Sequence, residues 1–276
     1  MVKSLTIKLL TTNYKLNISL RPKIIHLKKI RVGAVSYLNT RPLLYGIRHH
    51  KVLQQIELIE DYPAKIAHLL IEDKIDVGLI PVATIPRLKE HHIITDYCIG
   101  ADGPVASVCI FSEVPIEEVK NVYLDYQSKT SVNLARILLK EHWKKEVELI
   151  EARGEDFRAK IKGTTAGVII GDRALEQRTR SKYIYDLGEA WMKHTGLSFV
   201  FATWIANKKL PQQFIDDFNE ANAFGLQHIN EVINETGSSY FDLKKYYTNY
   251  ISYDLNNEKR KGMKLFLQLL NASVRK

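Results

Sequence analysis

The sequence predicts an α/β protein of two lobes, with two strands that cross between the lobes and a helical segment at the C-terminal end. From residue 30 onward, short apolar runs alternate with amphipathic helical segments, a pattern typical of largely parallel sheets covered by helices. Beyond residue 206 the pattern changes to helix alone. Two long apolar runs, at 105–111 and 199–206, lie near one third and two thirds of this region, where passages between two lobes would fall.

Nine apolar runs are expected to form strands. The first, Ile30–Val35, is mostly apolar, as a strand buried on both faces should be. Between the strands, apolar residues recur at helical spacing, as at 63–72 and 131–142. The other expected strands lie at 56–60, 77–80, 105–111, 122–124, 147–150, 167–170, 183–185 and 199–206.

The C-terminal part is expected to contain one long helix from Pro211 and a last amphipathic helix around 263–270. The crossing strands divide the chain into a first lobe of residues 30–110 and 200–276 and a second lobe of residues 111–199. A cleft between two lobes is a common place for a ligand. The apolar face of the long helix consists of Phe214, Phe218, Ala221, Gly225, Ile229 and Val232.

Composition excludes two classes of partner. The chain of 276 residues is 45% hydrophobic, which is enough for a large core. Its formal charge of +9 is concentrated at the N-terminus, because seven lysines and arginines precede residue 31 with no acidic residue among them. No basic stripe with interleaved aromatic residues follows, so nucleic acid is not an expected partner. No run approaches the roughly 20 apolar residues that a membrane helix needs.

Residues 1–29 are expected to be either a disordered extension ahead of the folded region or translated sequence upstream of the true start. Their only apolar run is interrupted by Lys8 and lacks the length of a secretory signal, so we expect a cytoplasmic protein. Cys98 and Cys109 lie in apolar runs at a spacing that matches no zinc or redox motif, which predicts buried thiols. No metal site is expected.

Four polar segments follow strands or open helices, where ligands of parallel α/β sheets bind. The first comes after the strand at 30–35 and contains Ser36, Tyr37, Asn39 and Thr40, with Pro42 suited to a first helical turn. Free amides at such a helix start favour an anion. A plain helix cap with a turn is the alternative interpretation.

The second segment, 100–107, is a tight turn that contains Gly103 and leads into the first crossing strand. Ser107 lies inside an apolar run, where its hydroxyl needs a partner; a ligand and a backbone carbonyl are both candidates. The third segment, with Ser128, Thr130 and Ser131, directly precedes a helix. Two hydroxyls and the free amides of a helix start can hold a carboxylate, although a simple cap would look the same.

The fourth segment places Asp172 at the cap of a helix after the strand at 167–170. Its carboxylate suits the positive end of the helix, so it would organise the loop rather than contact an anion. The sequence contains no glycine-rich phosphate loop, no G-x-S-x-G motif and no histidine or cysteine placed as an activated nucleophile in these segments. The predicted site is therefore polar but chemically mild.

These four segments, together with a fifth at 185–204, closely resemble the chorismate dehydratase family of the futalosine route to menaquinone. The resemblance is colinear over about residues 28–270. It implies the two-lobed fold of type II periplasmic binding proteins. The segments read SYLNTRPL at 36–43, DGPVAS at 102–107, SKTS at 128–131, GDRAL at 171–175 and YDLGEAWMKHTGLSFVFATW at 185–204.

The resemblance implies a cofactor-free lyase that removes water from chorismate to give 3-[(1-carboxyvinyl)oxy]benzoate. Asn39 and Ser107 are the catalytic residues that it implies. Loss of a ring proton and the neighbouring hydroxyl yields an aromatic ring, so positioning of the substrate can suffice. Two features depart from the family pattern: the N-terminal extension, and Ser198 where the family usually has proline.

Two alternatives remain open at this point. A solute-binding protein of the same fold is one, because fold alone does not determine function. It would need export, for which residues 1–29 lack the hydrophobic core. The dihydroxynaphthoate synthase of the same pathway is the other, but its family has a different, proline-rich segment where this chain has SYLNTRPL.

Overall fold

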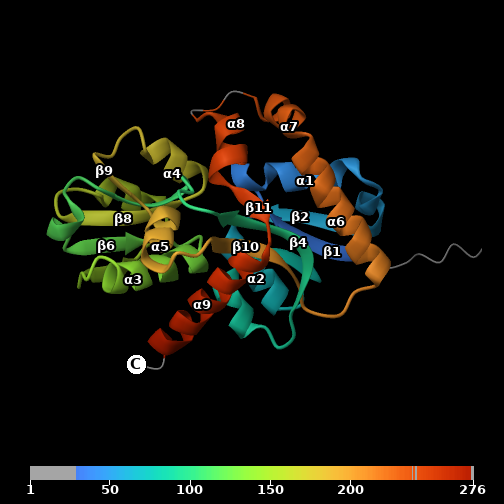
Figure 1. Ribbon diagram of the computed structural model, residues 1–276, viewed down its shortest axis with the longest axis horizontal. Helices are drawn as coiled ribbons and strands as arrows, with labels where there is room; N and C mark the ends of the chain where they lie inside the picture. Colours follow the sequence, from blue (N-terminus) through green and yellow to red (C-terminus); the bar gives the residue numbers. More distant parts are fainter. Residues whose placement is uncertain (1–28, 238, 240, 275–276) are drawn as a thin grey trace, which may run out of the picture.

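The computed structural model describes residues 29–237, 239 and 241–274. These residues form two lobes, each built on one mixed sheet with helices packed against it (Figure 1). The predicted α/β, two-lobed architecture is confirmed. Most of the extension, residues 1–28, lies outside the described residues.

The first sheet has six strands in the order β11-β4-β10-β3-β1-β2. Strand β1 (Ile30–Val35) pairs in parallel with β2 (Ile56–Asp61) and β3 (Val77–Pro81). Strand β10 (Phe199–Ala206) returns antiparallel between β3 and β4 (His92–Ala101). The central strands are almost entirely buried, which explains why their sequences are apolar without alternation.

The second sheet has five strands in the order β7-β6-β8-β5-β9. Its members are β5 (Val108–Ser112), β6 (Asn121–Leu124), β7 (Glu148–Glu151), β8 (Thr165–Ile170) and β9 (Tyr183–Asp186). Strands β6, β7 and β8 are parallel, and β5 runs antiparallel to β8 and β9. The carboxyl ends of β6 and β8 therefore meet at one edge of this sheet.

The helices divide between the lobes in chain order. The first lobe carries α1 (Arg41–His49), α2 (Pro63–Ile71), α6 (Gln212–Gln227), α7 (Ile229–Thr236) and the short α8 (Leu243–Lys245), which continues into a π-helical turn at Tyr246–Tyr250. The second lobe carries α3 (Lys129–Glu141), α4 (Asp172–Gln177) and α5 (Leu187–Thr195). None of the helices in the described ranges is long and apolar enough to cross a membrane.

The two predicted crossing strands need a correction. Strand β10 lies wholly in the first sheet, and the predicted strand at 105–111 begins only at Val108, in the second sheet. The chain passes from the first sheet to the second through non-strand residues at 102–107, the outward passage. It comes back through residues 196–198, the return passage. At 102–107, positive φ angles at Gly103 and Ala106 prevent a continuous strand. We propose these passages as the lobe boundaries, the first a few residues before the predicted one.

Two strands were missed, and one helix was predicted too long. Strand β4 and the short edge strand β11 (Ser252–Asp254) were not predicted, because β4 mixes polar with apolar residues and β11 is only three residues long. The helix expected from Pro211 is interrupted at His228, whose φ and ψ of −115° and 38° are not helical. The His228 ring stacks on Phe224 at 4.0 Å between centroids.

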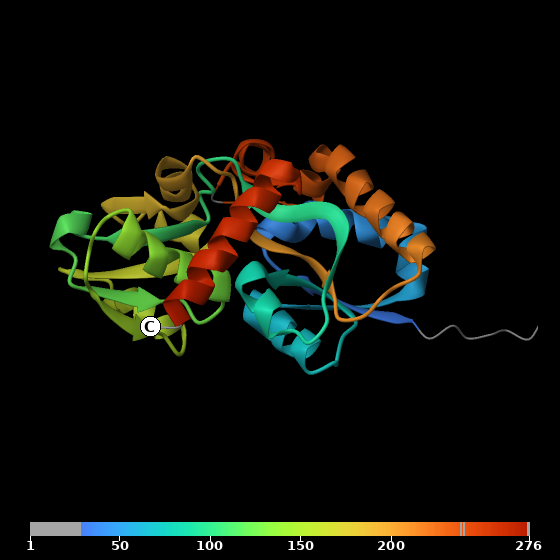
Figure 2. The same cartoon turned by 60° about the horizontal axis from the view of Figure 1, so that its bottom comes forward.

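The last helix, α9 (Asn257–Val274), connects the lobes. It packs on β10 of the first lobe and on α3 of the second, and both views show it crossing their junction (Figure 2). A Cβ atom on Gly262 would lie 2.0 Å from the carbonyl oxygen of Ser198, so α9 contacts the return passage backbone to backbone. The buried ammonium of Lys259 pairs with Asp102, at the start of the outward passage, at 3.0 Å.

Candidate active site between the lobes

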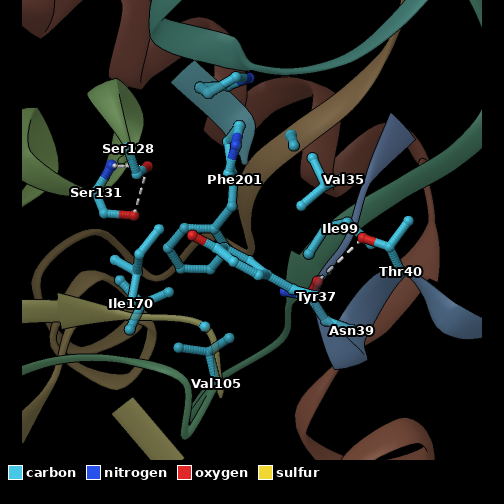
Figure 3. A pocket seen from close by; sticks show the side chains of 15 residues that line it. Val35, Tyr37, Asn39, Thr40, Ile99, Val105, Ser128, Ser131, Ile170 and Phe201 are labelled. Atoms are coloured by element: carbon cyan, nitrogen blue, oxygen red, sulfur yellow. Dashed lines mark hydrogen bonds between the residues drawn. The ribbon is translucent and has the colours of Figure 1, made fainter. Parts of the chain in front are cut away.

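A small cavity lies where the carboxyl ends of strands from both sheets face one another (Figure 3). Its volume is about 40 Å³, which is room for a few water molecules. Both lobes contribute apolar and polar side chains to its lining, and no lining residue carries a full charge. The lining consists of Val35, Tyr37, Asn39, Thr40, Pro63, Pro81, Ile99, Val105, Val108, Ser128, Ser131, Ile170, Gly171, Phe201 and Ala202.

The loop after β1 spans the cavity. Tyr37 extends from this loop toward the second lobe, where its hydroxyl donates to Oε1 of Gln127. The Tyr37 ring lies directly on Gly171, which has a φ of +64°; a Cβ atom there would come within 2.8 Å of the ring. Burial raises the pKa of Tyr37 above its usual range, so the hydroxyl stays protonated and can donate this hydrogen bond.

Asn39 and Thr40 line the cavity on the first lobe. The Thr40 hydroxyl donates to Oδ1 of Asn39 at 3.1 Å, and Tyr253 of β11 donates to the Asn39 carbonyl at 2.9 Å. Both the amide group and the backbone of Asn39 are therefore held in place. Ser36, three residues before Asn39, is exposed and does not line the cavity.

Ser128 and Ser131 line the cavity on the second lobe. Ser128 is the N-cap of α3: its hydroxyl accepts from the Ser131 amide at 3.2 Å and is 3.0 Å from the Ser131 hydroxyl. The positive end of the α3 dipole adds to these donors. Thr130, predicted with them, instead accepts a hydrogen bond from the Ala83 amide of the first lobe at 3.1 Å.

Ser107 is completely buried but does not line the cavity; its neighbours Val105 and Val108 do. The Ser107 hydroxyl is 3.4 Å from the Val105 carbonyl oxygen, which is a long hydrogen bond. It also lies beside the buried hydroxyl of Tyr246, for which the described residues offer no well-formed hydrogen bond. Gly103 has a φ of +155° and lies away from the cavity, in the outward passage.

Asp172 contacts the first lobe rather than capping its own helix. Gly171 occupies the N-cap position of α4, and Oδ1 of Asp172 accepts from the Leu38 amide at 3.0 Å. Burial raises the pKa of Asp172. The placement of Asp172 at the cap was therefore wrong by one residue, because Gly171, with its positive φ, takes the cap position and the helix already begins at Asp172.

A charged cluster beneath Tyr37 was not predicted. Arg173 donates to Asp125 and to Gln127 at 2.8 Å each, and to Glu155 at 2.7 Å. Gln127 thus accepts from both Arg173 and Tyr37. Two signals could have found this cluster: Asp125 directly follows a predicted strand, and Arg173 stands next to Asp172. Burial raises the pKa of Asp125, against the opposing effect of Arg173.

The structure therefore brings together five of the ten predicted site residues at the cavity and places the other five around it. Tyr37, Asn39, Thr40, Ser128 and Ser131 line it; Thr130 and Asp172 join the lobes; Ser36, Gly103 and Ser107 do not face it. In the part of the chain that the structure describes, no group of three histidine, cysteine or acidic side chains could hold a metal ion.

A family model described as menaquinone biosynthesis matches residues 30–272 of the chain. The chain belongs to this menaquinone biosynthesis family. The chain is 26% identical to chorismate dehydratase of Thermus thermophilus over 265 residues. The alignment covers 87% of this chain and 94% of the relative. The resemblance carried by the five sequence segments is thus confirmed at the level of the family.

Solved structures place this menaquinone biosynthesis protein among periplasmic-binding-protein folds. A protein of Archaeoglobus fulgidus superimposes with a TM-score of 0.74 at 14% identity, covering 91% of this chain and 100% of that one. The periplasmic aliphatic sulphonate-binding protein of Escherichia coli superimposes with a TM-score of 0.57 at 13% identity, covering 90% and 88%. A Candida albicans protein with the same generic fold gives 0.59 at 12% identity, covering 89% and 91%.

Proposed function

We propose that this protein is a chorismate dehydratase, which eliminates water from chorismate to form 3-[(1-carboxyvinyl)oxy]benzoate. The observation that supports this best is the arrangement of neutral donors on two walls of one cavity. Asn39 and Thr40 face it from the first lobe, and Ser128 and Ser131 at the start of α3 face it from the second. A substrate with two carboxylates matches two such walls.

The mechanism that we propose needs no strong protein base. The ring C–H bond next to the enolpyruvyl ether breaks, its electron pair forms the new ring double bond, and the neighbouring hydroxyl leaves and takes up a proton as water. The enolpyruvyl carboxylate of chorismate itself accepts the ring proton and passes it to the leaving hydroxyl, so that one water is released and the carboxylate is regenerated. Asn39 and Ser107 would hold that carboxylate and the leaving hydroxyl, and formation of the aromatic ring supplies the driving force.

The size of the cavity implies movement of the lobes. A space of about 40 Å³ holds a few water molecules and not a bicarboxylate of chorismate's size. Substrate would therefore enter when the lobes separate, and closure would bring the two walls onto it. Ser107 would reach the substrate only if closure around a ligand reshapes the apolar wall formed by Val105 and Val108.

The decisive experiment mixes purified protein with chorismate without added cofactor or metal. The product is followed by mass spectrometry for the loss of one water and by the ultraviolet spectrum of a carboxyvinyloxybenzoate. Asn39→Ala and Ser107→Ala variants are measured beside the wild type. Full turnover by both variants would contradict the residue assignment, although the reaction itself would stand.

A solute-binding function is the second candidate, and it is supported by the fold shared with the sulphonate-binding protein. The same experiment with purified protein and chorismate distinguishes a binding protein from an enzyme. Tight binding of chorismate without any product, measured by calorimetry, would favour a binding protein; product formation would exclude binding as the sole function.

A further inference from the structure

The backbone just before Ser107 makes an unusually tight turn. The Ser107 amide donates to the Val105 carbonyl at 2.7 Å, which closes a three-residue turn around Ala106. Ala106 has a φ of +62°, in the left-handed region that non-glycine residues rarely adopt. A γ-turn with positive φ at its centre is rare and strained, and such strain persists only where the surroundings enforce it.

Asp186, at the end of β9, supplies most of that enforcement. Its Oδ2 accepts from the Ala106 amide at 2.7 Å and from the Val105 amide at 3.1 Å. Arg178 holds the next peptide, donating to the Ala106 carbonyl at 3.2 Å. Asp186 is nearly buried, and Cys109, two residues after Ser107, is its partner in the pairing of β5 with β9.

The second oxygen of Asp186 has a different task. Oδ1 caps α5 by accepting from the Gly188 and Glu189 amides at 3.0 and 3.1 Å, and it shares the Val105 amide with Oδ2, also at 3.1 Å. Capping alone would need only this oxygen. The same carboxylate thus connects the start of α5 to the turn that holds Ser107, and Gly188 permits the approach, since a Cβ atom there would lie 2.5 Å from the Gly103 carbonyl oxygen.

We propose that Asp186 is a positioning residue for the dehydration, which acts through the 105–107 turn to set the direction of Ser107. This inference rests on the proposed function. Burial removes water as a competing partner for the turn, so only the carboxylate can satisfy two adjacent amides there. An asparagine at 186 would keep one acceptor and turn an amide group, itself a donor, toward either the turn or the helix.

The first test compares steady-state kinetics of wild type, Asp186→Asn, Ala106→Gly and the double variant on chorismate. We expect Asp186→Asn to lower kcat by about tenfold or more, with KM changed far less, because misplacement of a reacting group mainly affects the chemical step. Glycine adopts positive φ without strain, so Ala106→Gly should restore several-fold of the lost kcat in the double variant. A cap defect in α5 would not be rescued at residue 106.

Asp76→Asn is the matched control. Asp76 is also buried and bonded to a backbone amide, that of Arg31, but it lies in the first lobe away from the cavity. The Asp76→Asn variant should have a lower melting temperature than the wild type but the same kcat. If Asp186→Asn kept kcat within about twofold of the wild type, positioning by Asp186 would be wrong.

A crystal structure of Asp186→Asn gives a readout that does not depend on chorismate. We expect Ala106 to leave positive φ and the Ser107 hydroxyl to move relative to Val108. An unchanged turn would overturn the proposal even in an active enzyme. The wild type could fail to act on chorismate while the turn still relaxes in Asp186→Asn. That result would refute the proposed function, but Asp186 would remain the residue that places Ser107.

Discussion

Single side chains at the cavity are held by partners that lie far away in the sequence. Asn39 is restrained by its neighbour Thr40 through the side chain and by Tyr253, 214 positions later, through the backbone. An amide group fixed in this way can donate to a developing charge without first reorganising, which is the basis of electrostatic stabilisation of a transition state. Asn39 is therefore the residue whose truncation should affect turnover most directly.

Asn39→Ala is expected to lower kcat/KM by about 10² or more, since that is the usual effect of removing a preorganised donor. Steady-state kinetics on chorismate measure it. Asn133→Ala, on α3, is the control: its side chain donates to the Lys129 carbonyl of its own helix and does not line the cavity, so turnover should not change. Equal activity of the two variants would remove Asn39 from the mechanism.

Asp76 gives a residue-scale prediction about pH. Burial acts to raise its pKa, but hydrogen bonds from Arg31 and Lys208 outweigh burial and hold the pKa below the ordinary value of 3.8. The carboxylate therefore stabilises the folded state above that value, and this contribution is lost as the pH falls toward the lowered pKa. Asp76→Asn should lower the free energy of unfolding by about 1–3 kcal/mol at pH 7.

The difference between wild type and Asp76→Asn should shrink as the pH is lowered from 6 to 3, because Asp76 takes up a proton in the unfolded chain near its ordinary pKa of 3.8 while the folded state still resists protonation. Urea titrations at a series of pH values measure this. A difference that stays constant over the whole range would mean that the ion pair is not the source of the stability.

At the scale of elements, two helix starts and two loops form the junction between the lobes. The loop after β1 lies on the start of α4 through Tyr37 and Leu38, and the start of α3 contacts the first lobe through Thr130. The contact depends on Gly171, which combines a φ of +64° with direct contact to the Tyr37 ring. Sequence patterns locate these helix starts, but they do not reveal that Gly171 also contacts the Tyr37 ring.

Gly171→Ala is expected to destabilise the protein and to raise KM, since the added methyl group would displace Tyr37. Gly163→Ala is a matched control, because Gly163 has a similar φ of +56° but open space around its Cβ position. The backbone penalty of about 1 kcal/mol should appear in both variants. If both also had the same KM, contact between Tyr37 and Gly171 would not affect the site.

At the scale of the whole molecule, the lobes are held together by hydrogen bonds that cross between them and by α9 along their junction. The Thr130 hydroxyl bonds the Ala83 amide, and the Gln127 carbonyl accepts from the Ala64 amide at 3.0 Å. Behind the passages, Lys259 holds Asp102, whose lowered pKa also reflects hydrogen bonds from Ser252 and Ser198. Separation of the lobes would break the hydrogen bonds of Thr130 and Gln127 and leave the Lys259–Asp102 pair in place.

Thr130→Val should shift the protein toward an open form. In the closed form the Ala83 amide would be buried without a partner, at a cost of about 1–3 kcal/mol, whereas water can reach it when the lobes separate. Small-angle X-ray scattering without ligand should show a larger radius of gyration. Thr95→Val, a buried threonine that bonds within the first lobe, should leave the radius unchanged. The same radius in both variants would contradict this role for Thr130.

Much of the fold was predictable, because strands and helices depend on residues only a few positions apart. The nine predicted strand regions all contain strands, and the helix start at Ser128 follows local rules. The misses have local causes too: β4 lacks a clean apolar pattern, and the left-handed backbone at Ala106 has no signature in an alanine.

The sequence by itself determined the α/β class, the two lobes, the polar strand ends and the resemblance that the family match confirms. Only the tertiary structure decided which polar groups face the cavity. Thr130 and Asp172 turn to the opposite lobe, and Ser107 turns into the core beside a turn held by Asp186, 80 positions after Ala106. Side-chain direction depends on such distant packing partners, and a linear pattern of polar and apolar residues contains no information about them.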